Sequence, residues 1–578
     1  MKSGSRLFVL LFCGWLGTGC ALQTPPKEAP ASPAEPKATA IVEPQPELPP
    51  RPFPTETLYS LLAAEMAGSR QQYDIALSNY AQQAQETRDP QVAERATMIA
   101  RYLNDNATAA ANAVLWAELE PDNDQALGNA SYTLMQEGRL LEAFEMSRRL
   151  RQYKDESLFQ SIAANAGRLT YVQREELLAG YLQELEKYPQ DEQLLIGLGL
   201  LSQLQERPED ALEYARQTLK VHPRSTAATL LESSVLHHLN RTDEAIARLA
   251  AMLEHHPHHL RLRLQYARLL VNQDLSKAHQ QFEILVQQHP EDPDLLLSLA
   301  LVAMEEKNLD SAANALEQLL DFEAKASIAN FYLGQVSELR GERKRAVLHY
   351  LQVQPGENFL QANVNLLNIM VSEGDLLSAS QHIERVVTAR PELADNYQLL
   401  HAQALTRHDY LDAADAVLTQ ALTRSPNNAD LRYSRALVYE KQNQLPKAEQ
   451  DLRLILTREP NNPLVLNALG YMLADRTQRL AEAQEFLLQA VALSPEDPAI
   501  IDSLGWLYFR LGDYSEALVL LRRAYHLYPD PEVAAHLGEV LWVIGEQDEA
   551  RNVWQQSLER HPGNLFIEST MERLQVAP

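Results

Sequence analysis

Apolar side chains recur along this chain with the spacing of amphipathic helices. In the segment from Ala499 to Pro529, one helical face carries Ile501, Leu504, Gly505 and Tyr508, at positions i, i+3, i+4 and i+7. A glycine–aspartate pair then breaks the helix, a second apolar stripe follows, and the final proline cannot continue the hydrogen-bond ladder. The pattern predicts two helices joined by a short turn.

This helical hairpin is repeated almost end to end. Prolines recur every 33 to 35 residues, or at two or three times that spacing, at Pro121, Pro189, Pro223, Pro257, Pro290, Pro391, Pro426, Pro460, Pro495, Pro529 and Pro562. Alanine recurs near the start of each second helix, at Ala211, Ala245, Ala312, Ala346, Ala379, Ala414, Ala448, Ala483, Ala517 and Ala550. A fixed period of this length indicates a repeat protein whose units stack on one another.

The hairpin resembles the tetratricopeptide repeat (TPR), a helix-turn-helix of 34 residues. Ile501 stands in place of the usual tryptophan and Leu521 in place of the usual phenylalanine. The resemblance predicts an all-α fold, a TPR superhelical solenoid of about fifteen helix-turn-helix repeats. We expect divergent N-terminal helical repeats over residues 55–190, a TPR array over 191–562 and a capping helix over 563–578, since the last apolar face of an array needs a cover.

Composition narrows the range of partners. The 51 basic residues against 78 acidic ones give a formal charge of -27, which would repel a phosphate backbone and argues against nucleic acid. The only two cysteines are Cys13 and Cys20. A disulfide framework and a cysteine zinc site are therefore excluded from the body of the chain.

The N-terminus has the layout of an export signal. Two basic residues precede an apolar run too short to span a bilayer, so residues 1–19 are expected to be a signal peptide. The run ends in Leu16-Gly-Thr-Gly-Cys20, which resembles the bacterial lipobox and implies acylation of Cys20. An ordinary cleaved signal with an incidental cysteine is the alternative. Alanine at position 21, rather than aspartate, implies retention in the outer membrane, facing the periplasm. Residues 20–54, rich in proline, are expected to form an extended tether.

No constellation of residues indicates catalysis. The chain has no HExxH, GxSxG or phosphate-binding glycine loop, so the sequence predicts neither an enzyme nor a bound cofactor. The histidines at positions 255, 256, 258 and 259, with two more at 237 and 238, are the one metal-like group. They fall at an expected loop between repeats, and we interpret them as solvated side chains rather than zinc ligands.

Aromatic residues gather in the C-terminal third. In the TPR arrangement the first helix of each repeat lines the concave face, which predicts a partner-binding groove containing Tyr471, Trp506, Phe509 and Trp542. The alternative is that these rings pack against neighbouring helices. Trp506 and Phe509 are residues that the TPR motif does not require, so they are the first candidates for partner contact.

The stretch NALGYMLADR from Asn467 to Arg476, with DSLGWLYFRLGDYSEAL and AAHLGEVLW after it, resembles a group of proteobacterial TPR lipoproteins whose characterised member binds a periplasmic carboxyl-terminal processing protease. The resemblance implies an adaptor that activates the protease and presents protein substrates to it, such as peptidoglycan cross-link hydrolases. The alternative is a TPR scaffold for exopolysaccharide secretion or outer-membrane assembly.

Overall fold

A computed structural model of the protein describes residues 54–576, so the predictions for the signal peptide, for Cys20 and for all but the last residue of the tether lie outside the described residues. Within this part the chain folds into α-helices with three short 3₁₀ turns and no strand. It forms two compact units, residues 54–312 and residues 313–576. The all-α prediction is confirmed.

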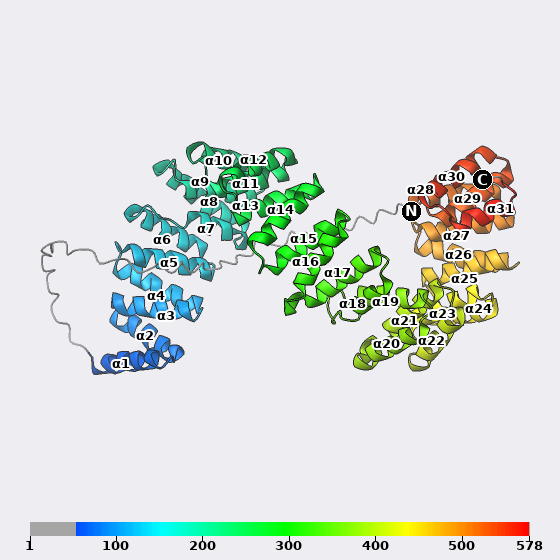
Figure 1. Cartoon of the computed structure of the whole chain (residues 1–578), viewed down its shortest axis with the longest axis horizontal. Helices are drawn as coiled ribbons and strands as arrows, with labels where there is room; N and C mark the ends of the chain where they lie inside the picture. The colour runs from blue at the N-terminus through cyan, green and yellow to red at the C-terminus, as the bar shows by residue number, and fades with distance from the viewer. Residues whose placement is uncertain (1–53, 577–578) are drawn as a thin grey trace. The chain divides into compact units, whose positions relative to one another are not determined.

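The first unit contains the helices α1 to α15 and the start of α16, with the 3₁₀ turn η1 (Ala166–Arg168) (Figure 1). Their bounds are α1 Thr55–Ser69, α2 Tyr73–Thr87, α3 Pro90–Tyr102, α4 Asn106–Leu119, α5 Asp124–Glu137, α6 Leu140–Tyr153, α7 Phe159–Asn165, α8 Tyr171–Lys187, α9 Glu192–Leu204, α10 Pro208–Val221, α11 Thr226–His238, α12 Thr242–His255, α13 Leu260–Leu270, α14 Leu275–Gln288, α15 Pro293–Glu305 and α16 Leu309–Leu319.

The second unit contains the rest of α16, the 3₁₀ turns η2 (Glu323–Lys325) and η3 (Pro391–Leu393), and fifteen further helices. Their bounds are α17 Ala326–Leu339, α18 Arg343–Tyr350, α19 Phe359–Ser372, α20 Leu376–Ala389, α21 Ala394–Arg407, α22 Leu411–Arg424, α23 Ala429–Lys441, α24 Leu445–Leu456, α25 Pro463–Arg476, α26 Leu480–Leu493, α27 Pro498–Leu511, α28 Tyr514–Leu527, α29 Pro531–Ile544, α30 Gln547–Arg560 and α31 Leu565–Arg573.

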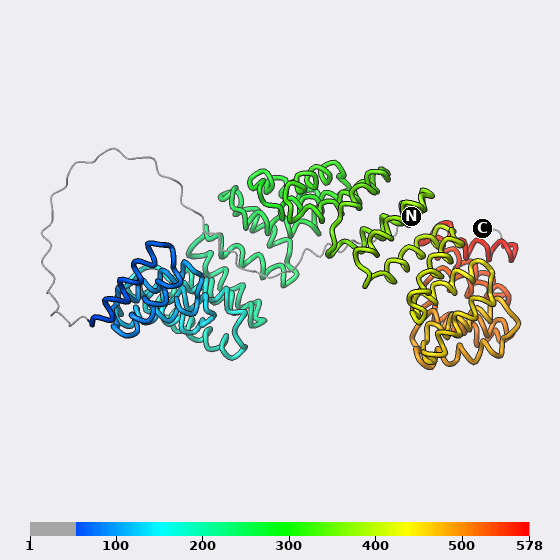
Figure 2. Tube along the Cα trace, turned by 90° about the horizontal axis from the view of Figure 1, so that it is seen from below, coloured from blue at the N-terminus to red at the C-terminus, as the bar shows by residue number. Residues whose placement is uncertain are grey.

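The 31 helices of the described part make fifteen successive pairs followed by α31, which confirms the predicted number of repeats. In most pairs the first and second helix contact each other, and the second helix then contacts the first helix of the next pair. Figure 2 shows the same side-by-side order along the tube within each unit. Because each helix touches mainly its sequence neighbours, the apolar core runs along each unit as a series of local clusters rather than as one centre.

The recurring alanines mark the closest approach of the paired helices. All ten alanines of the predicted series are fully buried, with 0% of their surface exposed. Ala278 fills the one gap in that series, and Ala76, Ala109 and Ala143 lie near the start of the second helices α2, α4 and α6 with 0 or 1% exposed. The same small residue therefore occupies this point in the regular repeats and in three of the four divergent ones, with α8 as the exception.

Enlarging one of these alanines should loosen its repeat. We expect Ala517→Leu in α28 to lower the free energy of unfolding by about 1–3 kcal/mol, because the side chain has no room to expand. Val519 on the same helix is 63% exposed, so Val519→Leu is a matched control that should leave stability unchanged. Urea unfolding followed by circular dichroism measures both variants, and equal midpoints would show that the alanine is not a packing constraint.

Many first helices begin with the same capping device. Asp89, Asp292, Asn462, Asp497 and Asp530 each precede a proline at the first helical position and accept a hydrogen bond from a backbone N–H of the first turn. These caps start a new helix only a few residues after the preceding one ends. The short connections hold successive repeats against one another.

Two repeats depart from the regular length, in the regions where the sequence pattern is irregular. The helix α7 has only 7 residues and runs into η1, while α18 has 8 residues and is followed by a loop around Pro355. At the C-terminus, α31 lies in the segment where a capping helix is expected and buries Ile567. No helix within residues 54–576 is long and apolar enough to cross a membrane.

Candidate partner-binding face

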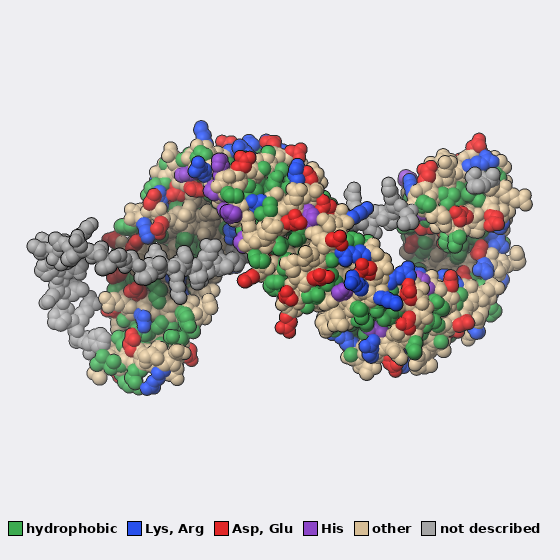
Figure 3. All heavy atoms as spheres, in the orientation of Figure 1, with side chains coloured by type: hydrophobic (Ala, Val, Ile, Leu, Met, Phe, Trp, Pro, Cys, Tyr) green, Lys and Arg blue, Asp and Glu red, His purple; other side chains and the backbone are tan. Residues whose placement is uncertain are grey.

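Polar and aromatic side chains of the last repeats meet on the first helices of successive pairs. We call this group the acid–aromatic face; it comes from α23, α25, α27 and α29 and consists of Glu440, Tyr471, Asp475, Asp502, Trp506, Glu532 and His536. The space-filling view shows acidic and hydrophobic side chains on the hollowed side of these last repeats (Figure 3). The face therefore combines charge with aromatic surface.

Trp506 lies at the centre of the face. Its indole Nε1 donates a hydrogen bond to Asp475 Oδ1 at 3.1 Å, and its ring stacks on the His536 imidazole with centroids 4.2 Å apart. Only 6% of the side chain is exposed. The ring therefore supports the face from beneath rather than facing open solvent, and the hypothesis that it contacts a partner stays a prediction.

His536 connects three helices through a chain of hydrogen bonds. Its Nδ1 lies 2.9 Å from Asp502 Oδ2, and its Nε2 lies 3.3 Å from the Tyr471 hydroxyl. That hydroxyl in turn donates to Glu532 Oε1 at 3.1 Å. Since a doubly protonated imidazole donates from both nitrogens, the order Asp502, His536, Tyr471, Glu532 satisfies each group in sequence.

The face holds more negative charge than its surroundings neutralise. Burial lowers the pKa of His536, but the carboxylates of Asp502 and Glu532 outweigh it and raise that pKa above its usual value. Burial raises the pKa of Glu532, although the charge of His536 opposes the shift. Burial also raises the pKa of the Tyr471 hydroxyl, and the neighbouring carboxylates add to it. These shifts show carboxyl groups crowded in a partly dry environment.

The structure brings together three of the four predicted groove residues. The rings of Tyr471 and Trp506 both lie against the His536 imidazole. The Phe509 ring is half-buried, and its centroid lies 5.0 Å from that of Trp506. Trp542 instead packs on its own second helix, where the Arg551 guanidinium lies 5.0 Å above its ring. Trp542 is half-buried and so keeps some accessible surface.

Sequence reasoning missed the polar half of this face. Asp502 lies on α27 and His536 on α29, and both side chains are buried, at 5% and 8% exposed. Asp502 lies four residues before Trp506, so a helical projection places the two side chains on one face. A carboxylate inside an apolar helix, one turn from an unexplained tryptophan, was the available signal.

The histidine-rich segment has structural roles. The His259 ring caps α13 by accepting a hydrogen bond from the Leu262 backbone N–H at 3.3 Å, and His258 Nδ1 lies 3.2 Å from Gln288 Nε2. His255 and His258 are exposed. Within residues 54–576 no three His, Cys, Asp or Glu side chains are arranged to hold a metal ion.

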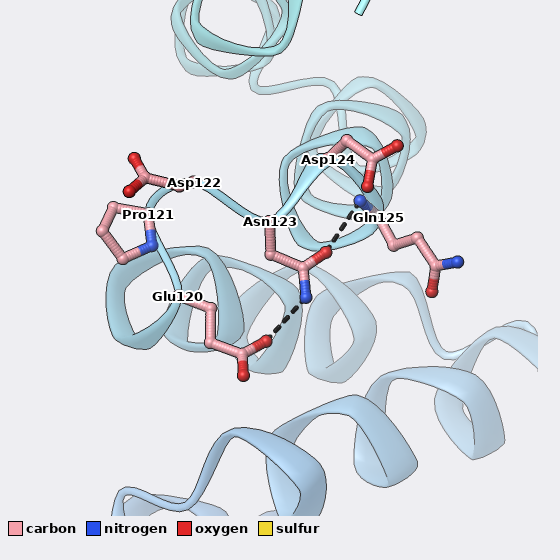
Figure 4. Close-up of a pocket in the computed structure, with 6 residues that line it drawn as sticks. All are labelled: Glu120, Pro121, Asp122, Asn123, Asp124 and Gln125. Atoms are coloured by element: carbon pink, nitrogen blue, oxygen red, sulfur yellow. Dashed lines mark hydrogen bonds between the residues drawn. The ribbon is translucent and has the colours of Figure 1, made fainter. Parts of the chain in front are cut away.

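A shallow pocket lies at the loop between α4 and α5 (Figure 4). Its polar groups are already paired, since Asn123 Nδ2 donates to Glu120 Oε2 at 2.7 Å and Asn123 Oδ1 accepts from the Gln125 backbone N–H at 2.9 Å. The Trp116 indole also donates to Glu120 at 2.9 Å. The pocket is therefore explained by the capping of α5.

Comparison with known proteins agrees with the repeat architecture. Two family models, both described as tetratricopeptide repeat, match this chain, one over residues 196–259, 267–326 and 399–463 and the other over 476–540. A TPR repeat-containing protein of Pseudomonas aeruginosa is 40% identical over 488 residues, which cover 84% of this chain and 82% of the relative. Neither family model describes an enzyme.

Solved structures with similar folds include a thermophilic TPR protein of Thermus thermophilus, 23% identical over 32% of this chain and all of that chain, with a TM-score of 0.30. A chain of the APC/C hetero-tetramer Cut9-Hcn1 is 15% identical over 90% of this chain and 96% of that chain, with a TM-score of 0.31. Repeat pattern, helix pairs, family models and the Pseudomonas relative agree, and the chain belongs to the tetratricopeptide repeat family.

Proposed function

We propose that this protein is a lipid-anchored periplasmic adaptor that binds and activates a carboxyl-terminal processing protease and presents protein substrates to it. The observation that carries the binding role is the acid–aromatic face, where partly exposed aromatic and charged groups gather on the first helices of the last repeats. The identity of the partner rests on the resemblance of residues 467–476 and the following repeats to protease-binding TPR lipoproteins.

The architecture suits an adaptor. TPR arrays are generally scaffolds for protein partners, and fifteen repeats in one chain offer separate surfaces to two partners at once. Holding a protease and its substrate on one chain raises their effective concentration to about millimolar without new contacts between them. In this proposal the lipid on Cys20 keeps the complex at the outer membrane.

Affinity capture from solubilised membranes tests the proposal. The protein with an affinity tag at its C-terminus should retain a soluble carboxyl-terminal processing protease, identified by mass spectrometry. A Cys20→Ser version should release the same protease into the soluble fraction. Capture of a membrane barrel or a polysaccharide synthase without the protease would instead support a scaffold for secretion or outer-membrane assembly.

The half-buried aromatic residues should contribute strongly to protease binding. We expect Phe509→Ala or Trp542→Ala to weaken the Kd for the purified protease about 30-fold, which corresponds to the roughly 2 kcal/mol typical of a hot-spot residue. Tyr528, 59% exposed just after the end of α28, provides the control Tyr528→Ala. Unchanged affinity in both test variants, with their melting temperatures preserved, would show that the protease binds another surface of the protein.

A further inference from the structure

We propose that the acid–aromatic face is a docking site for a cationic segment, in which a lysine or arginine side chain of a partner protein lies between Glu440 and Glu532. The inference rests on the proposed binding function and specifies the chemistry of the partner. The face binds a lysine or arginine side chain in this proposal, whichever partner presents the cationic segment.

Carboxyl groups from four successive first helices interact across the face. Burial raises the pKa of Glu440 on α23; Arg476 opposes the shift, while Asp475 on α25 and Glu532 on α29 add to it. Asp502 on α27 likewise acts on Glu532. Negative charges from separate repeats therefore act on one another across one face.

The face also has hydrogen-bond acceptors that lack donors. The Glu440 carboxylate forms no hydrogen bond or ion pair with any other residue of the described chain. An ammonium or guanidinium group brings several donors and no acceptor, so it matches both the charge and the hydrogen-bonding of this face.

The cations of the chain itself are committed elsewhere. Arg510 Nη1 donates to the backbone carbonyl of Asp475 at 2.6 Å, and Arg573 pairs with Glu539 at 2.6 Å. Arg476 is exposed and donates to Asn443 at 2.8 Å. His536 is held beneath the surface by Asp502. None of these cations forms a hydrogen bond or an ion pair with Glu440 or Glu532 within the described residues, so a cation of a partner can pair with these two carboxylates.

The aromatic groups suit the hydrocarbon part of such a side chain. Tyr471 and Phe509 are half-buried, so each keeps an edge accessible beside the carboxylates. A lysine or arginine stem packs on aromatic surface while its charged end reaches the acids, and the cation adds its attraction for the ring. The face therefore discriminates against acidic and small polar segments by charge and by shape.

Isothermal titration with an N-acetylated hexalysine peptide tests the site directly. The full chain should bind the peptide at one site, and the double variant Glu440→Gln/Glu532→Gln, which keeps size but removes two charges, should bind about tenfold more weakly or worse. Glu559→Gln removes an exposed acid from α30 and is the matched control, with affinity expected to match the unmodified chain. Burial raises the pKa values of Glu440 and Glu532, so the affinity for hexalysine should fall as the pH is lowered and these carboxylates take up protons.

Equal hexalysine affinity in the double variant and the unmodified chain would overturn the proposal, as would the absence of binding by the unmodified chain at low salt. Capture of the protease separates this result from the proposed function. If the double variant loses the peptide yet still retains the protease, the cationic site stands and the protease binds elsewhere. If protease capture fails while the peptide result holds, only the identity of the partner is wrong.

Discussion

Replacing Gly538 with alanine is expected to destabilise the last repeats by about 3 kcal/mol, at the upper end of the usual effect of overpacking. A Cβ atom built on Gly538 lies 2.1 Å from Nε1 and 2.3 Å from Cε2 of the Trp554 indole. That ring is fully buried between α29 and α30. Because a rigid ring enclosed on all sides cannot move away, the two helices must separate.

A double-mutant cycle tests whether the indole is the cause. Trp554→Ala alone should cost about 3–5 kcal/mol by leaving a cavity. In that background, Gly538→Ala has room, and it should stabilise by about 0.5–1 kcal/mol because alanine favours a helix more than glycine does. Gly128 on α5 has no non-local atom closer than 3.8 Å to its built Cβ, so Gly128→Ala should stabilise the unmodified chain.

Urea unfolding and local amide exchange in α29 and α30 measure this cycle. The sign reversal is the decisive result, since loss of glycine flexibility would act in the same direction in both backgrounds. A destabilisation by Gly538→Ala that persists without the indole would show that the helix pair is constrained by something other than the ring.

Acid is expected to loosen the middle repeats of the second unit. Burial lowers the pKa of His401 on α21 to about 4, and burial together with Arg385 lowers the pKa of His382 on α20 to about 4. Both folded values lie below the value of about 6.5 for an unfolded histidine, so the unfolded chain takes up protons first as the pH falls. Stability is therefore present above pH 6.5 and is lost toward pH 4, by about 2 kcal/mol for each histidine between pH 7 and pH 5.

Hydrogen exchange at pH 7 and pH 5, corrected for intrinsic rates, measures this loss by segment. Protection of α19 to α21 should fall, and the variant His382→Gln/His401→Leu should remove most of the pH dependence. In α29 we expect amide protection to rise rather than fall as the pH is lowered. The pKa of His536 is raised because the folded state stabilises its protonated form. Uniform acid loss of protection across both regions would contradict the assignment to these two buried rings.

Much of the fold could be predicted from the sequence because the same pattern of apolar residues, alanines and prolines recurs in most repeats. The buried alanines show this directly, since their period of about 34 residues needs no knowledge of long-range contacts. The short helices α7 and α18 lie where the regular proline spacing is interrupted, between Pro121 and Pro189 and between Pro290 and Pro391, so the sequence located these departures but did not give the helix lengths. Three of the four divergent N-terminal repeats keep the alanine, whereas α8 has no buried alanine.

The site was predictable only in part. The groove-facing positions of the first helices identified Tyr471, Trp506 and Phe509, but helical phase alone did not show that Trp506 is covered. That burial depends on His536, which lies 30 residues further along the chain on the next first helix. Pairing between repeats, such as that of Asp502 with His536, is tertiary information that a single-helix projection cannot supply.

Reconstitution with the purified carboxyl-terminal processing protease tests the central claim most directly. The rate of cleavage of a peptidoglycan cross-link hydrolase by the protease is measured with and without this protein at equal concentrations. The adaptor is expected to increase this rate about tenfold or more, since a shared scaffold concentrates the two partners. An unchanged cleavage rate, with all three proteins folded, would contradict the adaptor function.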